Sequence, residues 1–114
     1  MKSDSVFLQH ILDEIDFVLG ATKDLEFDAF EADETLRRAC VRSFEIIGEA
    51  VKKLSPALRK MHQDVEWQKI AGMRDKLIHH YFDVDLEVLW RAVQDNLPPL
   101  KNQIQQILQS DGLN

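Results

Sequence analysis

Cysteine, glycine and proline are all scarce in this sequence, and each scarcity excludes a class of structure. The 114 residues include one cysteine, four glycines and three prolines. The lone Cys40 excludes an intrachain disulfide and a cysteine-rich zinc site. With so few glycines and prolines, long segments are free to be helical. No segment approaches the roughly 20 consecutive apolar residues that a membrane-spanning helix needs.

Basic residues are also in the minority. The chain has 14 Lys and Arg against 20 Asp and Glu, which gives a net charge of −6. Broad, non-specific binding to nucleic acid needs a basic field that replaces counterions, so the composition argues against it but leaves room for a local basic cleft. The first residues place acids inside an apolar run, which is not the pattern of a signal peptide. We therefore expect a cytoplasmic protein that does not associate with membranes.

What the sequence does contain is helical periodicity over nearly its whole length. We expect one domain covering residues 1–114, folded as an all-α antiparallel bundle of four to five helices without strands. The first four expected helices cover residues 4–20, 33–54, 55–61 and 67–79. A fifth is expected to begin at Asp83 or Asp85 and to end at Pro98 and Pro99. These two prolines are expected to open the last helix. Asp33 is the expected N-cap of the second helix.

The second of these helices has an unusually wide apolar surface. Cys40, Ile47 and Leu54 share one face, and Phe44 and Val51 extend the apolar surface beyond it. A surface of that width suggests that the helix is covered on two sides, by its own bundle and by a second subunit. We therefore expect a homodimer.

An arginine interrupts the apolar stripe of the helix expected at residues 67–79. Trp67, Ile70 and Leu77 recur at the spacings of a core-facing helical side. Arg74 stands in the same stripe, where a leucine would be expected. A guanidinium at such a position must find a partner, line a cleft or destabilise the fold.

Asp75 and His79 extend this unusual group. They are four residues apart and therefore neighbours on a helix, where the carboxylate can orient one imidazole nitrogen and leave the other for proton transfer. Arg74 and His79, in contrast, point roughly 140° apart on a straight helix. The helix could unwind near His80 and Tyr81, the long arginine could curl round, or two copies of the helix could line one cleft across a two-fold axis. We favour the two-fold arrangement, because the wide apolar surface also needs a cover.

The combination of arginine and histidine suits phosphodiester cleavage in which the 2′-hydroxyl of RNA is the nucleophile. One group removes the hydroxyl proton, another protonates the leaving oxygen, and arginine stabilises the charge on the phosphate oxygens, with no metal or cofactor. The plainer alternative is a buried salt bridge from Arg74 to Glu45 or Glu49 with solvated histidines. A metal site at His79 and His80 is disfavoured, because adjacent helical residues point about 100° apart.

The pattern Arg74-x-x-x-x-His79-x-Tyr81 resembles the signature motif of the HepT-like toxins, a branch of the HEPN superfamily. The resemblance covers nearly the whole chain. It includes the blocks FEIIGEAVKKLSPALR, WQKIAGMRDKLIHHYFDVDLEVLW and DNLPPLKNQI. These long blocks make the resemblance far more specific than the short motif alone.

This resemblance implies a HEPN-like homodimer that acts as a metal-independent endoribonuclease toxin on mRNA or tRNA, within a bacterial or archaeal type VII toxin–antitoxin pair. It also implies a cognate MntA-like nucleotidyltransferase antitoxin, which transfers AMP to the motif tyrosine. Carried onto this sequence, Arg74 and His79 are the catalytic residues and Asp75 is a supporting residue. Tyr81 is the site of the O-AMP-tyrosine modification, and His80 receives no role.

A rival interpretation is a non-catalytic helical dimer that binds and assists a minimal nucleotidyltransferase. The two differ in what mutation of the motif residues would do, since only catalysis requires loss of RNA cleavage in a stable dimer. For an acidic chain, RNA affinity must come from a local basic patch. The candidates are Arg37, Arg38, Arg42, Lys52, Lys53, Lys69 and Lys76.

Overall fold

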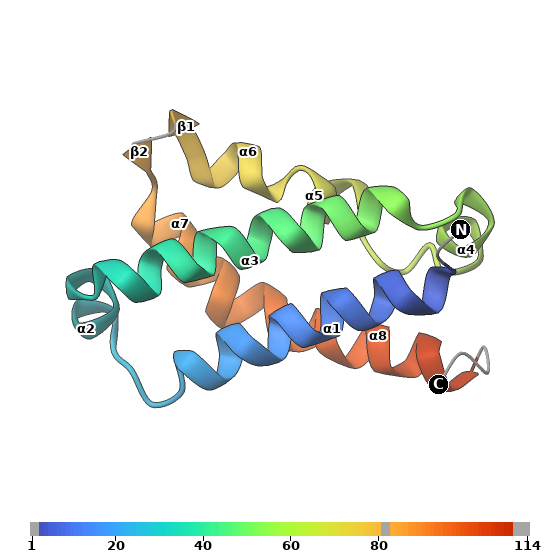
Figure 1. Cartoon of the computed structure of the whole chain (residues 1–114), viewed down its shortest axis with the longest axis horizontal. Coiled ribbons are helices and arrows are strands. Elements are labelled where there is room, and N and C mark those ends of the chain that lie inside the picture. Colours follow the sequence, from blue (N-terminus) through green and yellow to red (C-terminus); the bar gives the residue numbers. More distant parts are fainter. Residues whose placement is uncertain (1–2, 81–82, 111–114) are drawn as a thin grey trace.

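Three long helices form the body of the protein. The computed structural model describes residues 3–80 and 83–110. Helix α1 (Asp4–Ala21) packs against both α3 (Glu34–Lys53) and α8 (Leu97–Ser110). Figure 1 shows α1 running in the direction opposite to both. The expected all-α, HEPN-like antiparallel bundle is confirmed.

Short elements connect and cover these long helices. They are α2 (Phe27–Ala32), α4 (Pro56–Met61), α5 (Trp67–Ala71), α6 (Met73–Leu77), β1 (Ile78–His80), β2 (Asp83–Val84), α7 (Leu86–Arg91) and the π-helical segment η1 (Ala92–Asn96). Strands β1 and β2 pair antiparallel, with Ile78 opposite Val84. This pairing is a small correction to the expectation of no strands, but it is too short to form a layer of the fold.

Side-chain caps begin two of the helices at the positions that the sequence indicates. The carboxylate of Asp33 accepts a hydrogen bond from the backbone N–H of Leu36 at 3.0 Å, which confirms it as the N-cap of α3. Asp85 caps α7 in the same way, accepting from the N–H of Val88 at 3.1 Å. The start of the helix after β2 is thereby settled in favour of Asp85 over Asp83.

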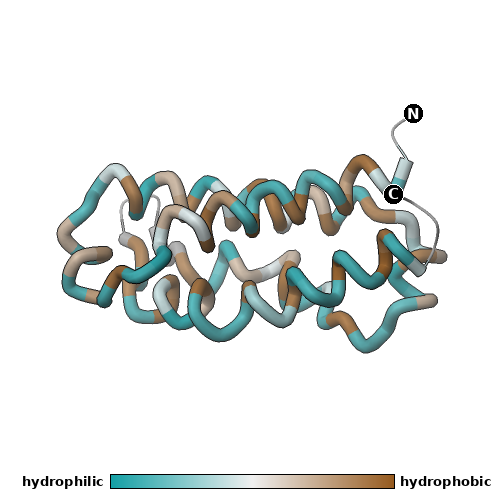
Figure 2. The backbone as a smooth tube through the Cα atoms, turned by 90° about the horizontal axis from the view of Figure 1, so that it is seen from below, coloured by the Kyte–Doolittle hydropathy of each residue, from teal (hydrophilic) through white to brown (hydrophobic). Residues whose placement is uncertain are grey.

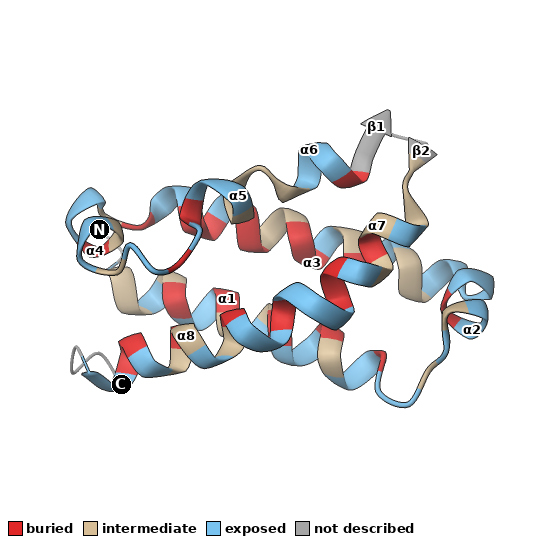
Figure 3. Ribbon diagram, turned by 180° about the vertical axis from the view of Figure 1, so that it is seen from behind, coloured by how far each residue is buried: buried red, intermediate tan, exposed pale blue. Residues whose placement is uncertain are grey.

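The core lies where α1, α3 and α8 face one another. Figure 2 shows hydrophobic and hydrophilic positions alternating along the helices, and Figure 3 shows buried positions recurring along the same three. The buried side chains of α1 are Leu8, Ile11, Ile15 and Val18, and those of α3 include Cys40, Phe44, Ile47 and Val51. Within the described ranges, no helix combines the length and the apolar character that crossing a membrane requires.

The helix expected at residues 67–79 is interrupted twice. Gly72 separates α5 from α6, and α6 already ends at Leu77. Glycine has a low helix propensity, which makes it the natural place for the first break. At the second break, the carbonyl of Leu77 accepts a hydrogen bond from the N–H of Asp85 at 2.8 Å, which joins the end of α6 to the start of α7. The expectation of one continuous helix was therefore wrong.

The prolines near the end of the chain do not separate two helices. Elements α7, η1 and α8 follow one another without a gap, and the chain changes direction between α7 and α8 (Figure 1). Pro98 and Pro99 fall in the first turn of α8, where a missing backbone N–H is tolerated. Just before them the N–H of Leu97 bonds to the carbonyl of Ala92, five residues back, which is the wider π-helical spacing. The expectation that the prolines open the last helix is therefore confirmed, whereas the expected end of the helix before them is replaced by a π-helical segment.

A close approach at Gly48 fixes where α5 lies on α3. A Cβ atom at this position would stand 3.2 Å from the carbonyl oxygen of Ala71. The absence of a side chain therefore allows the backbone of α5 to lie directly against α3. Because α6 follows α5 after a single residue, this contact also positions Arg74.

Candidate active site

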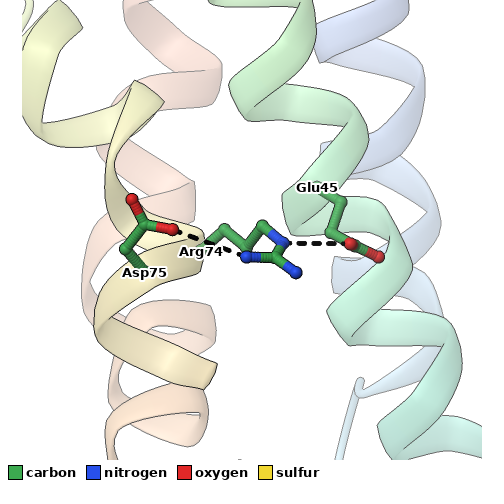
Figure 4. A network of polar contacts seen from close by, with 3 residues as sticks. All are labelled: Glu45, Arg74 and Asp75. Atoms are coloured by element: carbon green, nitrogen blue, oxygen red, sulfur yellow. Dashed lines mark hydrogen bonds and ion pairs between the residues drawn. The ribbon is translucent and has the colours of Figure 1, made fainter. Parts of the chain in front are cut away.

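Arg74 lies on the surface of the bundle, between α6 and α3. Its side chain is 47% exposed, whereas Trp67 and Leu77, which share its expected stripe, are buried. The expectation that Arg74 occupies the apolar seam was therefore wrong. The reason is the break at Gly72, because residues before and after it no longer follow one helical phase. Figure 4 shows the guanidinium extending from α6 toward Glu45 on α3.

Two carboxylates hold the guanidinium. Its Nε donates to Oε2 of Glu45 at 3.1 Å, and its Nη1 approaches Oδ1 of Asp75 at 3.5 Å. Glu45 was one of the two partners proposed from the sequence, and that choice is confirmed over Glu49. The salt bridge of the plainer alternative therefore exists, but at the surface. Since the guanidinium has five N–H groups, most of them remain available to an anion.

Asp75 contacts the arginine rather than completing a helical pair. It was expected to face His79 one turn along a helix, but α6 ends between the two residues and His79 lies in β1. The side chain of Asp75 is 83% exposed, and its Oδ1 lies 3.5 Å from Nη1 of Arg74. The side chains of His79 and His80 lie outside the part that the structure describes, and so does the whole of Tyr81. Their expected roles remain predictions.

A hollow of about 410 Å³ opens beside Arg74, and we call it the Arg74 hollow. It is lined by Phe7 and His10 of α1, by Arg42, Ile46 and Lys53 of α3, and by Arg74 itself. Glu45 and Glu49 also border it. The sequence analysis did not find this group, because no local pattern tells which faces of α1 and α3 meet α6.

Only some of the basic residues proposed as an RNA patch line the Arg74 hollow. Arg42 and Lys53 line it, and the side chain of neither forms a hydrogen bond or ion pair with another described residue. Arg38 instead pairs with Glu34 at 2.8 Å on the exposed side of α3. Lys69 pairs with an acid of its own helix region, Glu66, at 3.3 Å. Of the seven candidates, Arg42 and Lys53 are the ones that line the hollow beside Arg74.

Among the described residues, Cys40 is the one whose acidity is clearly perturbed. It is fully buried on α3, away from the surface that carries Arg74. Burial, with a smaller contribution from the charge of Asp33, raises the pKa of its thiol from 9.0 to about 11. A thiol with a raised pKa is a poor nucleophile, so Cys40 packs as a small apolar residue. Among the described residues, no three His, Cys, Asp or Glu side chains gather as metal ligands would.

The fold and this surface define an all-α bundle protein with an arginine-centred polar site next to the end of a short helix. A family model described as ribonuclease HepT-like matches residues 11–107 of the chain. The match spans most of the bundle, from the middle of α1 to near the end of α8. The protein therefore belongs to the HepT-like ribonuclease family, of the HEPN type.

Curated relatives are named as ribonucleases. A protein of Caldanaerobacter subterraneus subsp. tengcongensis named as a candidate RNase is 46% identical over 111 residues, covering 97% of this chain and 99% of the relative. One of Thermococcus cleftensis, named probable ribonuclease HepT, is 36% identical and covers 93% of this chain and 96% of its own. A candidate RNase of Methanocaldococcus jannaschii is 37% identical, over 90% of this chain and 84% of its own. No solved structure matches the chain.

Proposed function

We propose that this protein is the toxin of a toxin–antitoxin pair and a metal-independent endoribonuclease that cleaves mRNA or tRNA. The observation that carries the proposal is the state of Arg74. Its guanidinium is held in place by Glu45, is half exposed beside a hollow, and keeps N–H groups available to an anion. Membership of the HepT-like ribonuclease family supports phosphate of RNA as that anion.

In the proposed reaction the 2′-oxygen of a ribose attacks the adjacent phosphorus while the bond to the 5′-oxygen of the next nucleotide breaks. His79 either takes the proton from the 2′-hydroxyl or gives one to the leaving 5′-oxygen, and solvent water makes the other of these two transfers. Arg74 binds the non-bridging oxygens, whose negative charge increases in the transition state. Asp75 supports Arg74 through their contact. The products are a 2′,3′-cyclic phosphate and a free 5′-hydroxyl.

We further propose that a cognate nucleotidyltransferase antitoxin silences this activity by transferring AMP from ATP to Tyr81. The phenolic oxygen of Tyr81 forms a bond to the α-phosphorus of ATP, and pyrophosphate leaves. The modification adds a negative phosphate and a bulky base seven residues after Arg74. The phosphate would compete with RNA for the guanidinium, and the base would obstruct the approach of a strand.

Substitution of the motif residues tests catalysis directly. Arg74→Ala and His79→Ala are expected to abolish RNA cleavage and growth inhibition while melting temperature and oligomeric mass barely change. If both variants still cleave RNA, the catalytic assignment is wrong. The non-catalytic alternative predicts a different result. The wild type would itself be inactive on RNA, and both variants would lose binding of the nucleotidyltransferase.

Modification of the tyrosine has a separate test. Tyr81→Phe is expected to keep RNA cleavage and to escape silencing by the nucleotidyltransferase and ATP. Mass spectrometry of the wild type after the same incubation should show added AMP, which the variant lacks. Full neutralisation of Tyr81→Phe would show that this residue is not the target.

We also propose that the toxin acts as a homodimer whose cleft is lined by both protomers. The support for a dimer is the family resemblance, because Phe44 and Val51, which the sequence led us to expect under a second subunit, are buried within the single chain. Mixing Arg74→Ala with His79→Ala protein tests the arrangement. Recovered activity in the mixture means that the two residues act across the dimer, whereas an inactive mixture of confirmed heterodimers means that each protomer has its own pair.

A further inference from the structure

The Arg74 hollow has a composition that one chemical class of ligand would satisfy. Its interior is apolar, with the half-buried Phe7 and Ile46, and its rim carries the positive charges of Arg42, Lys53 and Arg74. Its volume of about 410 Å³ lies within the range of roughly 300–1,000 Å³ that is typical of ligand pockets. A flat apolar body joined to a phosphate would use both parts.

The aromatic side chains supply a surface for stacking. The rings of Phe7 and His10 lie one turn apart on α1, with their centroids 6.4 Å apart and their planes tilted by 55°. Single-stranded nucleic acid is commonly bound by bases stacked on such side chains, inside a positively charged groove. Phe7 is therefore the candidate stacking platform, and His10 is its neighbour.

The cations are spaced for a strand rather than for one anion. Arg42 and Lys53 are eleven residues apart on α3, which places them about 16 Å apart along the helix axis. Arg74 reaches α3 at Glu45, between these two positions. A strand crossing the hollow would therefore meet Arg74 and then one of the flanking cations, so that successive phosphates each find a positive charge.

The acids of the hollow do not oppose this arrangement. Glu45 already accepts a hydrogen bond from the Nε of Arg74. The other N–H groups of the Arg74 guanidinium remain available to a phosphate. Glu49 has no hydrogen bond to another described residue, and a carboxylate there can accept one from an amino group of a base or from a 2′-hydroxyl. The site therefore offers a contact for each part of a ribonucleotide.

We propose that the Arg74 hollow is a subsite for the RNA nucleotide next to the scissile phosphate, with the base on Phe7 and a neighbouring phosphate at Arg42. This assignment rests on the proposed ribonuclease function and specifies how the substrate strand is held. It adds α1, which lies outside the motif, to the substrate-binding surface. It also identifies the ligand class as single-stranded RNA.

The probe is a 5′-phosphorylated dinucleotide with 2′-O-methyl riboses, which cannot be cleaved because the nucleophile is blocked. Binding is measured by titration calorimetry. Phe7→Ala is expected to weaken binding at least about fivefold, the lower end of what loss of a stacking side chain costs. Phe7→Leu keeps most of the packing of α1 and should also weaken binding, which protects the test if the alanine variant is unstable.

Arg42→Ala tests the phosphate contact. It should weaken binding and make the dependence of log K on log salt shallower by up to about 0.7, the value per phosphate for single strands. Each variant has a matched control outside the hollow. Phe17→Ala removes another α1 phenylalanine, which is 49% exposed, and Arg38→Ala removes an α3 arginine paired with Glu34. Both controls should bind the dinucleotide as the wild type does.

The possible outcomes separate this inference from the proposed function. If Phe7 and Arg42 variants bind like their controls while Arg74→Ala still abolishes cleavage, the subsite is wrong and the ribonuclease proposal stands. If they weaken binding but Arg74→Ala and His79→Ala both cleave RNA, the subsite stands and the catalytic assignment fails. A change in oligomeric mass at Phe7 with unchanged dinucleotide affinity would instead make the hollow a contact between protomers, which overturns the subsite.

Discussion

Glu45 is the residue whose substitution most sharply tests the role of Arg74. Its carboxylate accepts from Nε of Arg74 at 3.1 Å, and the two side chains are 30% and 47% exposed. An ion pair this accessible to solvent contributes at most about 1 kcal/mol to folding. A domain with an ordinary stability of roughly 5–15 kcal/mol stays folded after such a loss, and its melting temperature falls by about 5 °C or less. Glu45→Ala should therefore leave the protein folded.

Activity should respond far more strongly than stability. Helix α6 has only five residues, so the tie to the long helix α3 is what restrains the guanidinium. A catalytic group displaced by about 1 Å can lower the rate up to about a hundredfold. We expect Glu45→Ala to reduce RNA cleavage about ten- to a hundredfold, and Glu45→Gln to restore part of the rate, since its amide oxygen can accept the same hydrogen bond.

The assay compares RNA cleavage rate and melting temperature for each variant. Glu34→Ala is the matched control, because Glu34 is also an α3 glutamate paired with an arginine, Arg38, but lies outside the site. Cleavage by Glu45→Ala at the wild-type rate, with Arg74→Ala inactive, would show that the ion pair does not position the arginine. A faster Glu45→Ala would reverse the interpretation, because the glutamate would then compete with substrate.

Three further predictions concern the scaffold. Asp4→Ala should lower the free energy of unfolding by about 1–3 kcal/mol in urea titrations, because its carboxylate accepts from the backbone N–H and the hydroxyl of Ser55 at 2.8 and 2.6 Å. The free energy of unfolding should fall as pH rises from 9.0 to about 11, because the Cys40 thiol loses its proton over that interval in the unfolded chain but not in the folded protein, where its pKa is about 11. Cys40→Ala should remove this component of the pH dependence. Gly48→Leu should lower both melting temperature and RNA cleavage, because a side chain there would push α5 away from α3 at Ala71.

The parts of the fold that the sequence predicts correctly are those decided by neighbouring residues. The buried stripe of α1 follows from the spacing of Leu8, Ile11 and Ile15, and the cap at Asp33 follows from a preference for that residue type. At Pro98 and Pro99 the prediction that the last helix opens there is also confirmed, because both prolines lie in the first turn of α8. The prediction that the preceding helix ends there was wrong, because a π-helical segment joins α7 to α8.

The site itself depends on how distant segments meet, and the sequence predicts only part of it. The sequence indicates Glu45 or Glu49 as the salt-bridge partner of Arg74, because both lie on the expected second helix. Choosing between them requires the register of α6 along α3, which the close contact at Gly48 helps to set. At the end of α6, the carbonyl of Leu77 bonds to the N–H of Asp85, and no helical periodicity in residues 67–79 could reveal this contact.

That early end of α6 changes the argument for a cleft shared by two protomers. The separation of roughly 140° between Arg74 and His79 holds only on one straight helix. In the structure Arg74 belongs to α6 and His79 to β1, so the angle no longer applies to this pair. Geometry within one chain therefore no longer requires a second copy to bring the two residues to one phosphate. The reason that remains for a shared cleft is the family resemblance, and it concerns dimer formation rather than the position of the catalytic pair.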